Sequence, residues 1–217
     1  MITTIKFKST IANFPILEKR GSFYDMATNL LNKKFEIEAY VLILATWNFA
    51  YFRYGVKNFD INNFKKKIKE LEPCFDKLDN EECRTIDIDR HKETIKTIYD
   101  ALAAFEGVGA TGASKIMHLR NRNLFIMWDR FIRGDEAKSY YDNLDTIAEG
   151  YPAKAKYGNN GYDYCLFLKD MQETFRNVVF DNENKTFAKA IDEYNYISIT
   201  LKIQAAKKEE EKKKNRK

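Results

Sequence analysis

The sequence has few of the residues that make tight turns, metal sites or disulfide frameworks. It contains 9 glycines and 3 prolines among 217 residues, which disfavours a β-rich fold built on frequent turns. Its 3 cysteines and 2 histidines form neither a CxxC pair nor a zinc-ligand spacing, so no metal site is expected. No apolar run approaches the ~20 residues of a membrane helix, and the N-terminus lacks a signal-peptide core. These absences predict a soluble, intracellular, cytoplasmic protein with no membrane partner.

The positive charge is concentrated at the C-terminal end. The formal net charge is +5, but residues 207–217 include seven basic and three acidic residues and therefore carry +4 of it. Since this run has no apolar face, we expect a solvated, disordered tail. The rest of the chain is close to neutral, so any affinity for nucleic acid must come from a local basic patch.

Hydrophobic residues recur at helical spacing along most of the chain. They make up 44% of the sequence, which is enough for a hydrophobic core, and the expected fold class is all-α. The pattern predicts one buried helix ending near Gly55, and a second helix that is capped by Asp60 and interrupted at Pro73. Residues 1–20 carry no clear pattern. The predicted helices cover residues 22–35, 36–55, 60–78, 87–105, 111–120, 128–144, 162–180 and 184–204.

Two glycines flank Val108 in a tight turn between two predicted helices. The first helix ends at Phe105, and the second begins just after the turn. Glycine tolerates positive φ and lets backbone N–H groups approach a phosphate, while the helix start adds free N–H donors. This turn is therefore predicted to grip a DNA backbone without reading its sequence. The residues expected at that interface are Gly107, Val108, Gly109, Thr111, Lys115, Arg120 and Arg122.

An aspartate follows this turn in a hydrophobic context. Residues 126–133 read Ile-Met-Trp-Asp-Arg-Phe-Ile-Arg, with the acid at Asp129. Together, the Gly-Val-Gly turn and this segment resemble the helix-hairpin-helix DNA glycosylase superfamily, which includes endonuclease III and the mismatch adenine glycosylases. In endonuclease III-like members a catalytic lysine stands two residues after the second glycine and eighteen before the catalytic aspartate. The same spacing leads here to Thr111 and Asp129.

The resemblance implies both an architecture and a reaction. It implies two helical lobes with DNA between them, one made of residues 1–55 and 158–206, the other of residues 56–157 with the hairpin at 105–133. The reaction is hydrolysis of the N-glycosidic bond of a damaged, mismatched or modified base that has been rotated out of the duplex. Asp129 would stabilise positive charge on the sugar and orient the attacking water. The implied partner is double-stranded DNA, bound by a monomer.

Three departures from the family pattern refine this expectation. Thr111 cannot form a Schiff base, which implies a monofunctional glycosylase without strong lyase activity. Lys115 lies one turn beyond it on the same helix face and is a candidate for a relocated Schiff-base lysine. Cys165 stands alone, so the iron–sulfur cluster of some members is not expected, and no cofactor is implied.

A base pocket is also implied by the resemblance. Residues 42–54 are similar to the buried helix whose end loop lines the damaged-base site in the family, which makes Trp47 and Asn48 pocket candidates. Trp128, beside the aspartate, is a third candidate, and Phe49 and Tyr51 could add aromatic walls. Aromatic residues in an apolar helix also commonly belong to the core. His118 is expected on the surface.

Each of these features also has a structural interpretation. Gly107 and Gly109 can simply separate two helices, and Asp129 can serve as an ordinary helix N-cap. The main alternative function is a non-catalytic DNA-binding module that keeps the hairpin. A helical protein-binding domain is a third possibility, and a flat DNA-binding titration at low salt would favour it.

Overall fold

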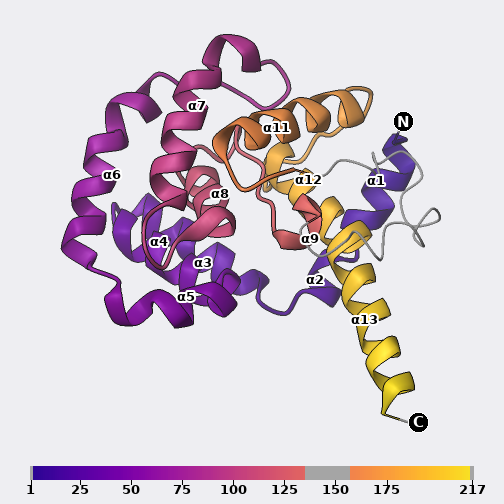
Figure 1. The fold of residues 1–217 in the computed structure, drawn as a ribbon. Helices are drawn as coiled ribbons and strands as arrows, with labels where there is room; N and C mark the ends of the chain where they lie inside the picture. The colour runs from indigo at the N-terminus through magenta and orange to yellow at the C-terminus, as the bar shows by residue number, and fades with distance from the viewer. Residues whose placement is uncertain (1, 135–156, 216–217) are drawn as a thin grey trace.

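Every regular element in the described part of the chain is a helix, which confirms the all-α fold (Figure 1). The computed structural model describes residues 2–134 and 157–215. The helices are α1 (Thr4–Ile11), α2 (Phe14–Leu17), α3 (Gly21–Asn32), α4 (Glu36–Trp47), α5 (Phe49–Gly55), η1 (Val56–Asn58), α6 (Ile61–Asp76), α7 (Ile88–Ala103), α8 (Gly109–Arg120), α9 (Arg130–Arg133), α11 (Gly161–Phe175), α12 (Phe187–Asn195), η2 (Tyr196–Thr200) and α13 (Leu201–Lys214). Of the helix predicted over residues 128–144, the structure contains α9, and residues 135–156 lie outside the described part. None of the described helices is both long and apolar enough to cross a membrane.

Helix α8 occupies the centre of the molecule. Every residue from 112 to 119 is buried, and the helix packs against α7 on one side and α4 on another. Helix α7 in turn packs against α11, and α3 covers α4 (Figure 1). Because α8 is enclosed by its neighbours, its first turn and the preceding glycine turn are held in a fixed place.

The N-terminal residues, which carry no clear pattern, form helices that join the core. Phe7 of α1 is fully buried, with ring centroids 5.4 Å from Phe175 of α11 and 5.5 Å from Tyr194 of α12. One continuous hydrophobic cluster connects these residues with the buried faces of α4, α7 and α8. The division into two lobes therefore stays a prediction.

The helix predicted over residues 36–55 is divided at Asn48. Helix α4 ends at Trp47 and α5 begins at Phe49. The Asn48 side chain donates a hydrogen bond of 2.8 Å to the carbonyl oxygen of Val108, sixty residues away in sequence. A periodic pattern cannot reveal such a break, because the cause is a contact with a distant segment.

Helix α6 continues through Pro73, so the predicted interruption there is wrong. The N-cap prediction holds, because the Asp60 carboxylate accepts hydrogen bonds from the backbone N–H groups of Asn62 and Asn63. Pro73 lies in the last turn, where a missing N–H removes a single hydrogen bond near the helix end. Burial of the apolar face on both sides of Pro73, including Phe75, offsets that loss.

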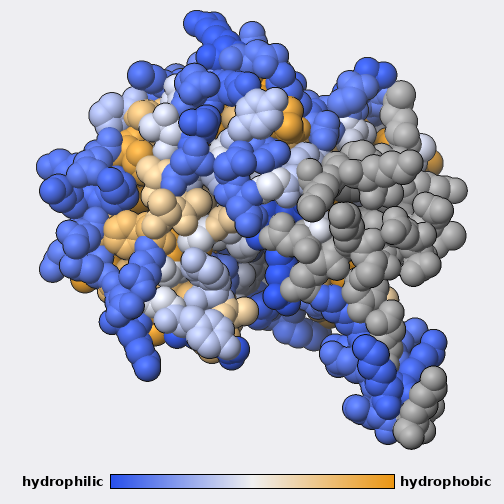
Figure 2. Space-filling model, in the orientation of Figure 1, coloured by the Kyte–Doolittle hydropathy of each residue, from blue (hydrophilic) through white to orange (hydrophobic). Residues whose placement is uncertain are grey.

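The C-terminal helix is longer than the sequence suggests. Helices α12, η2 and α13 follow one another without a break, and α13 reaches Lys214. The charged segment from residue 207, for which a disordered tail or a frayed helix end is expected, is helical as far as Lys214. Ala, Glu and Lys are strong helix formers, and Glu209 and Lys213 stand at favourable four-residue spacing. The end of α13 projects away from the body (Figure 1), and its surface is hydrophilic (Figure 2).

Gly55→Ala should destabilise the fold, whereas Gly21→Ala should not. A Cβ on Gly55 would lie 2.6 Å from the Cα of Gly107, whereas a Cβ on Gly21 would meet nothing within 4 Å. We expect the free energy of unfolding in urea to fall by about 1–3 kcal/mol for Gly55→Ala. It should stay level or rise slightly for Gly21→Ala. Equal stability of the two variants would show that the contact between Gly55 and Gly107 does not hold the turn.

Candidate functional site

The turn between α7 and α8 adopts the conformation that the glycines were predicted to provide. Gly107 and Gly109 have φ values of +83° and +61°. A Cβ on Gly107 would lie 2.9 Å from the ring of Phe59, and one on Gly109 would lie 2.8 Å from the ring of Tyr51. Val108 between them is fully buried. Its side chain therefore belongs to the core and cannot contact a ligand.

The first turn of α8 opens onto a cavity. The side chain of the N-cap residue, Val108, makes no hydrogen bond to the backbone of this first turn. The first N–H groups of any helix also lack partners within the helix. Gly109, Ala110 and Thr111 all line the cavity. The helix start thus presents backbone donors toward open space, as expected for a seat that holds an anion.

The cavity has a volume of about 810 Å³ and is built from segments far apart in the sequence. Its walls come from the start of α8, the corner between α4 and α5, residues 128–133 and the C-terminal helix. Among its lining side chains four are cationic and three anionic, namely Arg20, Lys115, Arg130, Arg133, Glu18, Asp129 and Asp192. No cluster of His, Cys, Asp and Glu that could hold a metal ion occurs in residues 2–134 and 157–215.

Asp129 lies on this cavity and is also the N-cap of α9. Its Oδ1 atom accepts hydrogen bonds from the backbone N–H groups of Phe131 (2.8 Å) and Ile132 (2.9 Å). Its Oδ2 atom accepts one from the hydroxyl of Thr200 (2.7 Å). The two interpretations of this acid from the sequence are thus compatible, since a capped aspartate is rigidly held while its carboxylate still borders the cavity.

Polar residues of the C-terminal helices α12, η2 and α13 form another part of the cavity wall. Asp192, Tyr196, Thr200 and Gln204 stand four residues apart, and all of them line the cavity. In a regular α-helix each four-residue step overshoots a full turn by about 40°, so such a row drifts around the helix. The π-helical segment η2 between Tyr196 and Thr200 has wider turns, which counteract that drift.

Lys115 is buried, although it was predicted to bind DNA at the surface. Its side chain lines the cavity with 7% of its area exposed, and its ammonium lies 5.6 Å from the centre of the Trp47 ring. Burial lowers the pKa of Lys115, and the nearby carboxylates of Asp192 and Asp129 partly oppose this effect. This group can reach a molecule only inside the cavity.

Arg120 and Arg122 do not lie near the glycine turn, so their predicted role in reinforcing it is wrong. They stand at or just beyond the C-terminal end of α8, about 16 Å from its start for a helix of this length. The Arg120 guanidinium forms ion pairs with Glu72 (3.2 Å), Asp76 (3.5 Å) and Asp79 (3.0 Å). Its charge is therefore compensated by α6 and the residues that follow it.

The three predicted base-pocket residues all line the cavity, but their surroundings differ. Trp47 is half-buried and its ring stacks on that of Tyr24, 5.7 Å away. Asn48 is buried, and its side-chain amide donates a hydrogen bond to the carbonyl oxygen of Val108. Trp128 is 1% exposed, and its indole N–H donates to the carbonyl of Ala110. Trp128 therefore supports the start of α8 from the core, and Trp47 offers the larger accessible surface.

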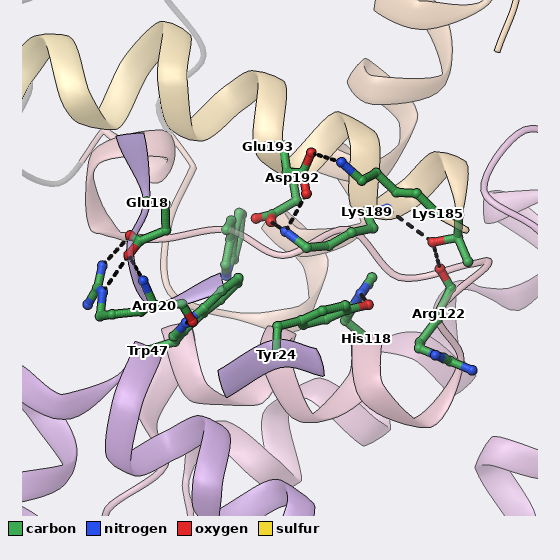
Figure 3. Close-up of polar contacts among 12 residues, drawn as sticks. Glu18, Arg20, Tyr24, Trp47, His118, Arg122, Lys185, Lys189, Asp192 and Glu193 are labelled. Carbon is green, nitrogen blue, oxygen red and sulfur yellow. Dashed lines mark hydrogen bonds and ion pairs between the residues drawn. The ribbon is translucent and has the colours of Figure 1, made fainter. Parts of the chain in front are cut away.

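A buried ion cluster lies behind Trp47 (Figure 3). The Lys189 ammonium is 2.7 Å from Asp192 and 3.4 Å from Glu193. It also faces an aromatic cage, defined as the rings of Phe14, Tyr24 and Trp47, whose centres lie 4.5, 5.0 and 4.8 Å away. Lys189 therefore satisfies both carboxylates and fills the cage from within the protein.

His118 is buried, although it was expected at the surface. Its Nδ1 atom lies 2.6 Å from the carbonyl oxygen of Phe125 and its Nε2 atom 2.8 Å from the hydroxyl of Tyr24. Burial lowers the pKa of His118 to about 4, so the ring is neutral near pH 7. Through Tyr24 this histidine supports the ring of Trp47 (Figure 3).

Glu18 and Arg20 form a second ion pair on the cavity wall (Figure 3). The Glu18 carboxylate is buried and accepts hydrogen bonds from the Arg20 side chain at 2.8 and 2.6 Å. Burial raises the pKa of Glu18, but the hydrogen bonds from Arg20 and Tyr196 outweigh it and lower the pKa to about 2. This pair links the N-terminal segment to the C-terminal helix.

Comparisons of the chain with protein-family models, with curated proteins and with solved structures found no match. The geometry of the cavity is therefore the ground on which a function is proposed.

The hydroxyl of Thr200 should couple energetically to Asp129. In a double-mutant cycle of Thr200→Val and Asp129→Ala, we expect a coupling energy of about 1.5–3 kcal/mol, typical of a hydrogen bond to a charged group. Urea unfolding measures each variant. As a control, Thr200→Val combined with Asp60→Ala should be additive, because Asp60 caps the distant α6. A coupling no larger than in the control would mean that Thr200 does not hold the carboxylate.

Glu18→Gln should weaken the fold near neutral pH but not in acid. The folded-state pKa lies below the ordinary value of 4.5, so the stabilisation is present above pH 4.5 and is lost as the pH falls toward 2. Because Arg20 is half exposed and solvent screens the pair, we expect the free energy of unfolding to fall by about 1–3 kcal/mol near pH 7. Urea unfolding across this pH range, with the exposed Glu38→Gln as control, checks this. A difference independent of pH would contradict the ion-pair explanation.

Proposed function

We propose that the protein is a monofunctional DNA glycosylase, which hydrolyses the N-glycosidic bond of a damaged, mismatched or modified base rotated out of the duplex. One observation carries the proposal. The start of α8, with no side-chain cap from Val108, and the carboxylate of Asp129 border the same cavity. A phosphate held at the start of α8 would present its sugar to the carboxylate of Asp129. Contacts with neighbouring elements fix both groups in place.

The start of α8 and the cations around the cavity suit a DNA backbone. The N–H groups of the first turn and the positive end of the helix dipole attract a phosphate. Arg130 lines the cavity and adds positive charge, a role predicted for Arg120 and Arg122. In this proposal DNA lies between the two predicted lobes, with its backbone across the glycine turn.

Asp129 suits the chemistry because it is fixed and borders the cavity. As the base departs, positive charge develops on the deoxyribose, and a preorganised carboxylate stabilises that charge without having to move. Three hydrogen bonds hold Asp129, while a carboxylate offers about four acceptor positions. The remaining position can orient the attacking water.

The cavity is large enough for an extruded base. Its volume of about 810 Å³ falls within the usual range of ~300–1,000 Å³ for sites that bind small molecules. Trp47, Phe49, Tyr51 and Tyr196 provide aromatic surfaces in its lining. Stacking on such surfaces offsets the few kcal/mol that base extrusion costs.

A non-catalytic DNA-binding module is the alternative, favoured by one observation. Asp129 has a complete structural role as the N-cap of α9, which would explain its presence without any reaction. The two functions differ in their affinity for a duplex whose abasic-sugar analogue carries a positive charge. Only the enzyme is expected to bind that analogue more tightly than plain duplex DNA.

Asp129→Asn should abolish base excision. The test uses duplexes that each carry one modified or mismatched base, followed by hot alkali to cut abasic sites. Strand scission is expected with at least one duplex, and Asp129→Asn should slow it about 100-fold or more. Asp60→Asn is the matched control, because Asp60 also caps a helix through two backbone N–H groups but lies outside the cavity.

Thermal unfolding should confirm that both variants are folded, since asparagine caps a helix about as well as aspartate does. The absence of scission with every duplex, or scission that survives Asp129→Asn, would refute the enzymatic function. If duplex binding then remained salt-dependent, the DNA-binding module would be the supported function.

A further inference from the structure

Lys115 differs from the other buried charged groups around the cavity. Its side chain is more than nine-tenths buried and lines the cavity. Within residues 2–134 and 157–215, its ammonium has no hydrogen bond or ion pair, and its close neighbour is the ring of Trp47. An ammonium removed from water without such partners is costly, so a protein that keeps one at a cavity wall has a use for it there.

Charged groups face Lys115 from several directions. Asp192 and Lys189 approach from α12, Asp129 from the start of α9, and Arg20 from the segment before α3. Helix α4 contributes Trp47, and α8 itself contributes His118, which is neutral near pH 7. Lys189 is already bound by Asp192 and Glu193. Lys115 is thus a buried cation that can interact with a molecule in the cavity.

The geometry points to Lys115 as the proton donor to the departing base, an inference that rests on the proposed glycosylase function. Lys115 and Asp129 border one cavity but carry opposite charges, and the broken bond needs both. The sugar carbon becomes positive and faces the carboxylate. The base leaves with the electron pair of the C–N bond and becomes negative, a charge that a nearby cation or proton donor stabilises.

The step balances as follows. The C1′–N bond breaks heterolytically, and the base anion takes a proton from the Lys115 ammonium to leave as a neutral base. Water adds to C1′ with its oxygen and gives up one proton, which Asp129 can pass on to restore the ammonium. The net reaction is hydrolysis, with no change in the protonation of the protein. It requires no imine between Lys115 and the sugar.

This assignment also defines a substrate class. A neutral base, such as an oxidised or deaminated one, is a poor leaving group and gains from a proton donor. A base alkylated on a ring nitrogen already carries positive charge, needs no proton to depart, and would be repelled by the buried ammonium. Lys115 therefore selects neutral bases with a ring nitrogen or carbonyl oxygen facing it, and selects against alkylated cationic bases.

Base excision measured in a single turnover tests the proton-donor role. Lys115→Met should slow excision of a neutral base about 100-fold or more, while Lys96→Met, a half-buried position on α7 outside the cavity, should have no effect. Because burial lowers the pKa of Lys115, the wild-type rate should fall as the pH rises through that lowered value. Lys115→Arg, if it retains activity, should lack this alkaline fall, because arginine stays charged.

A binding experiment keeps the inference testable if no excision is found. Duplexes carrying a 2′-fluoro nucleotide that resists cleavage are prepared with either guanine or cationic 7-methylguanine. The wild type should bind the guanine duplex about tenfold more tightly, and Lys115→Met should lose this preference. This result in a protein without excision activity would refute the glycosylase function while supporting contact between Lys115 and the base.

Two outcomes would overturn the role of Lys115. One is excision and binding preference unchanged in Lys115→Met. The other is a covalent complex with abasic DNA, trapped by borohydride in the wild type and absent in Lys115→Met, because it would show that the amine attacks the sugar and does not protonate the base.

Discussion

The hydrogen bond from the Asn48 side chain to the carbonyl of Val108 determines where the cavity lies. It ends α4, turns the chain into α5 and draws the glycine turn against that corner. Gly55 can then approach Gly107 so closely that a Cβ on Gly55 would clash with the backbone of Gly107. With the turn fixed, α8 enters the core at one angle, and Lys115 in its second turn reaches the cavity. A single polar contact between distant segments thus positions the groups on which the proposed chemistry relies.

Charge in the cavity is arranged so that most groups are neutralised locally. Glu18 is paired with Arg20, and Asp192 with Lys189, in both cases through short contacts. Within residues 2–134 and 157–215, Asp129 accepts hydrogen bonds from backbone N–H groups and a hydroxyl and forms no ion pair. Its negative charge is therefore held in place but not cancelled, which is the condition for stabilising positive charge that appears only during a reaction.

The sequence predicted what depends on local chemistry. It predicted the helical periods, the Asp60 cap and the positive φ of Gly107, because each of these follows from neighbouring residues. The missed features depend on contacts between distant segments. The break at Asn48 needs Val108, and the ion pairs of Arg120 need another helix. The four-residue spacing from Asp192 to Gln204 was visible, but only the π-helical turns show that this row faces the cavity.

Lys189, which is enclosed by Phe14, Tyr24 and Trp47, limits which ligands the protein can bind. Cages of this kind hold quaternary ammonium groups in other proteins, but here the ammonium of Lys189 already occupies the space. Choline-like or methylated-lysine ligands are thereby excluded from it. The Trp47 ring lies 4.8 Å from the Lys189 ammonium and 5.6 Å from that of Lys115, so it already interacts with two cations. The indole therefore favours electron-rich, uncharged heterocycles over positively charged ones.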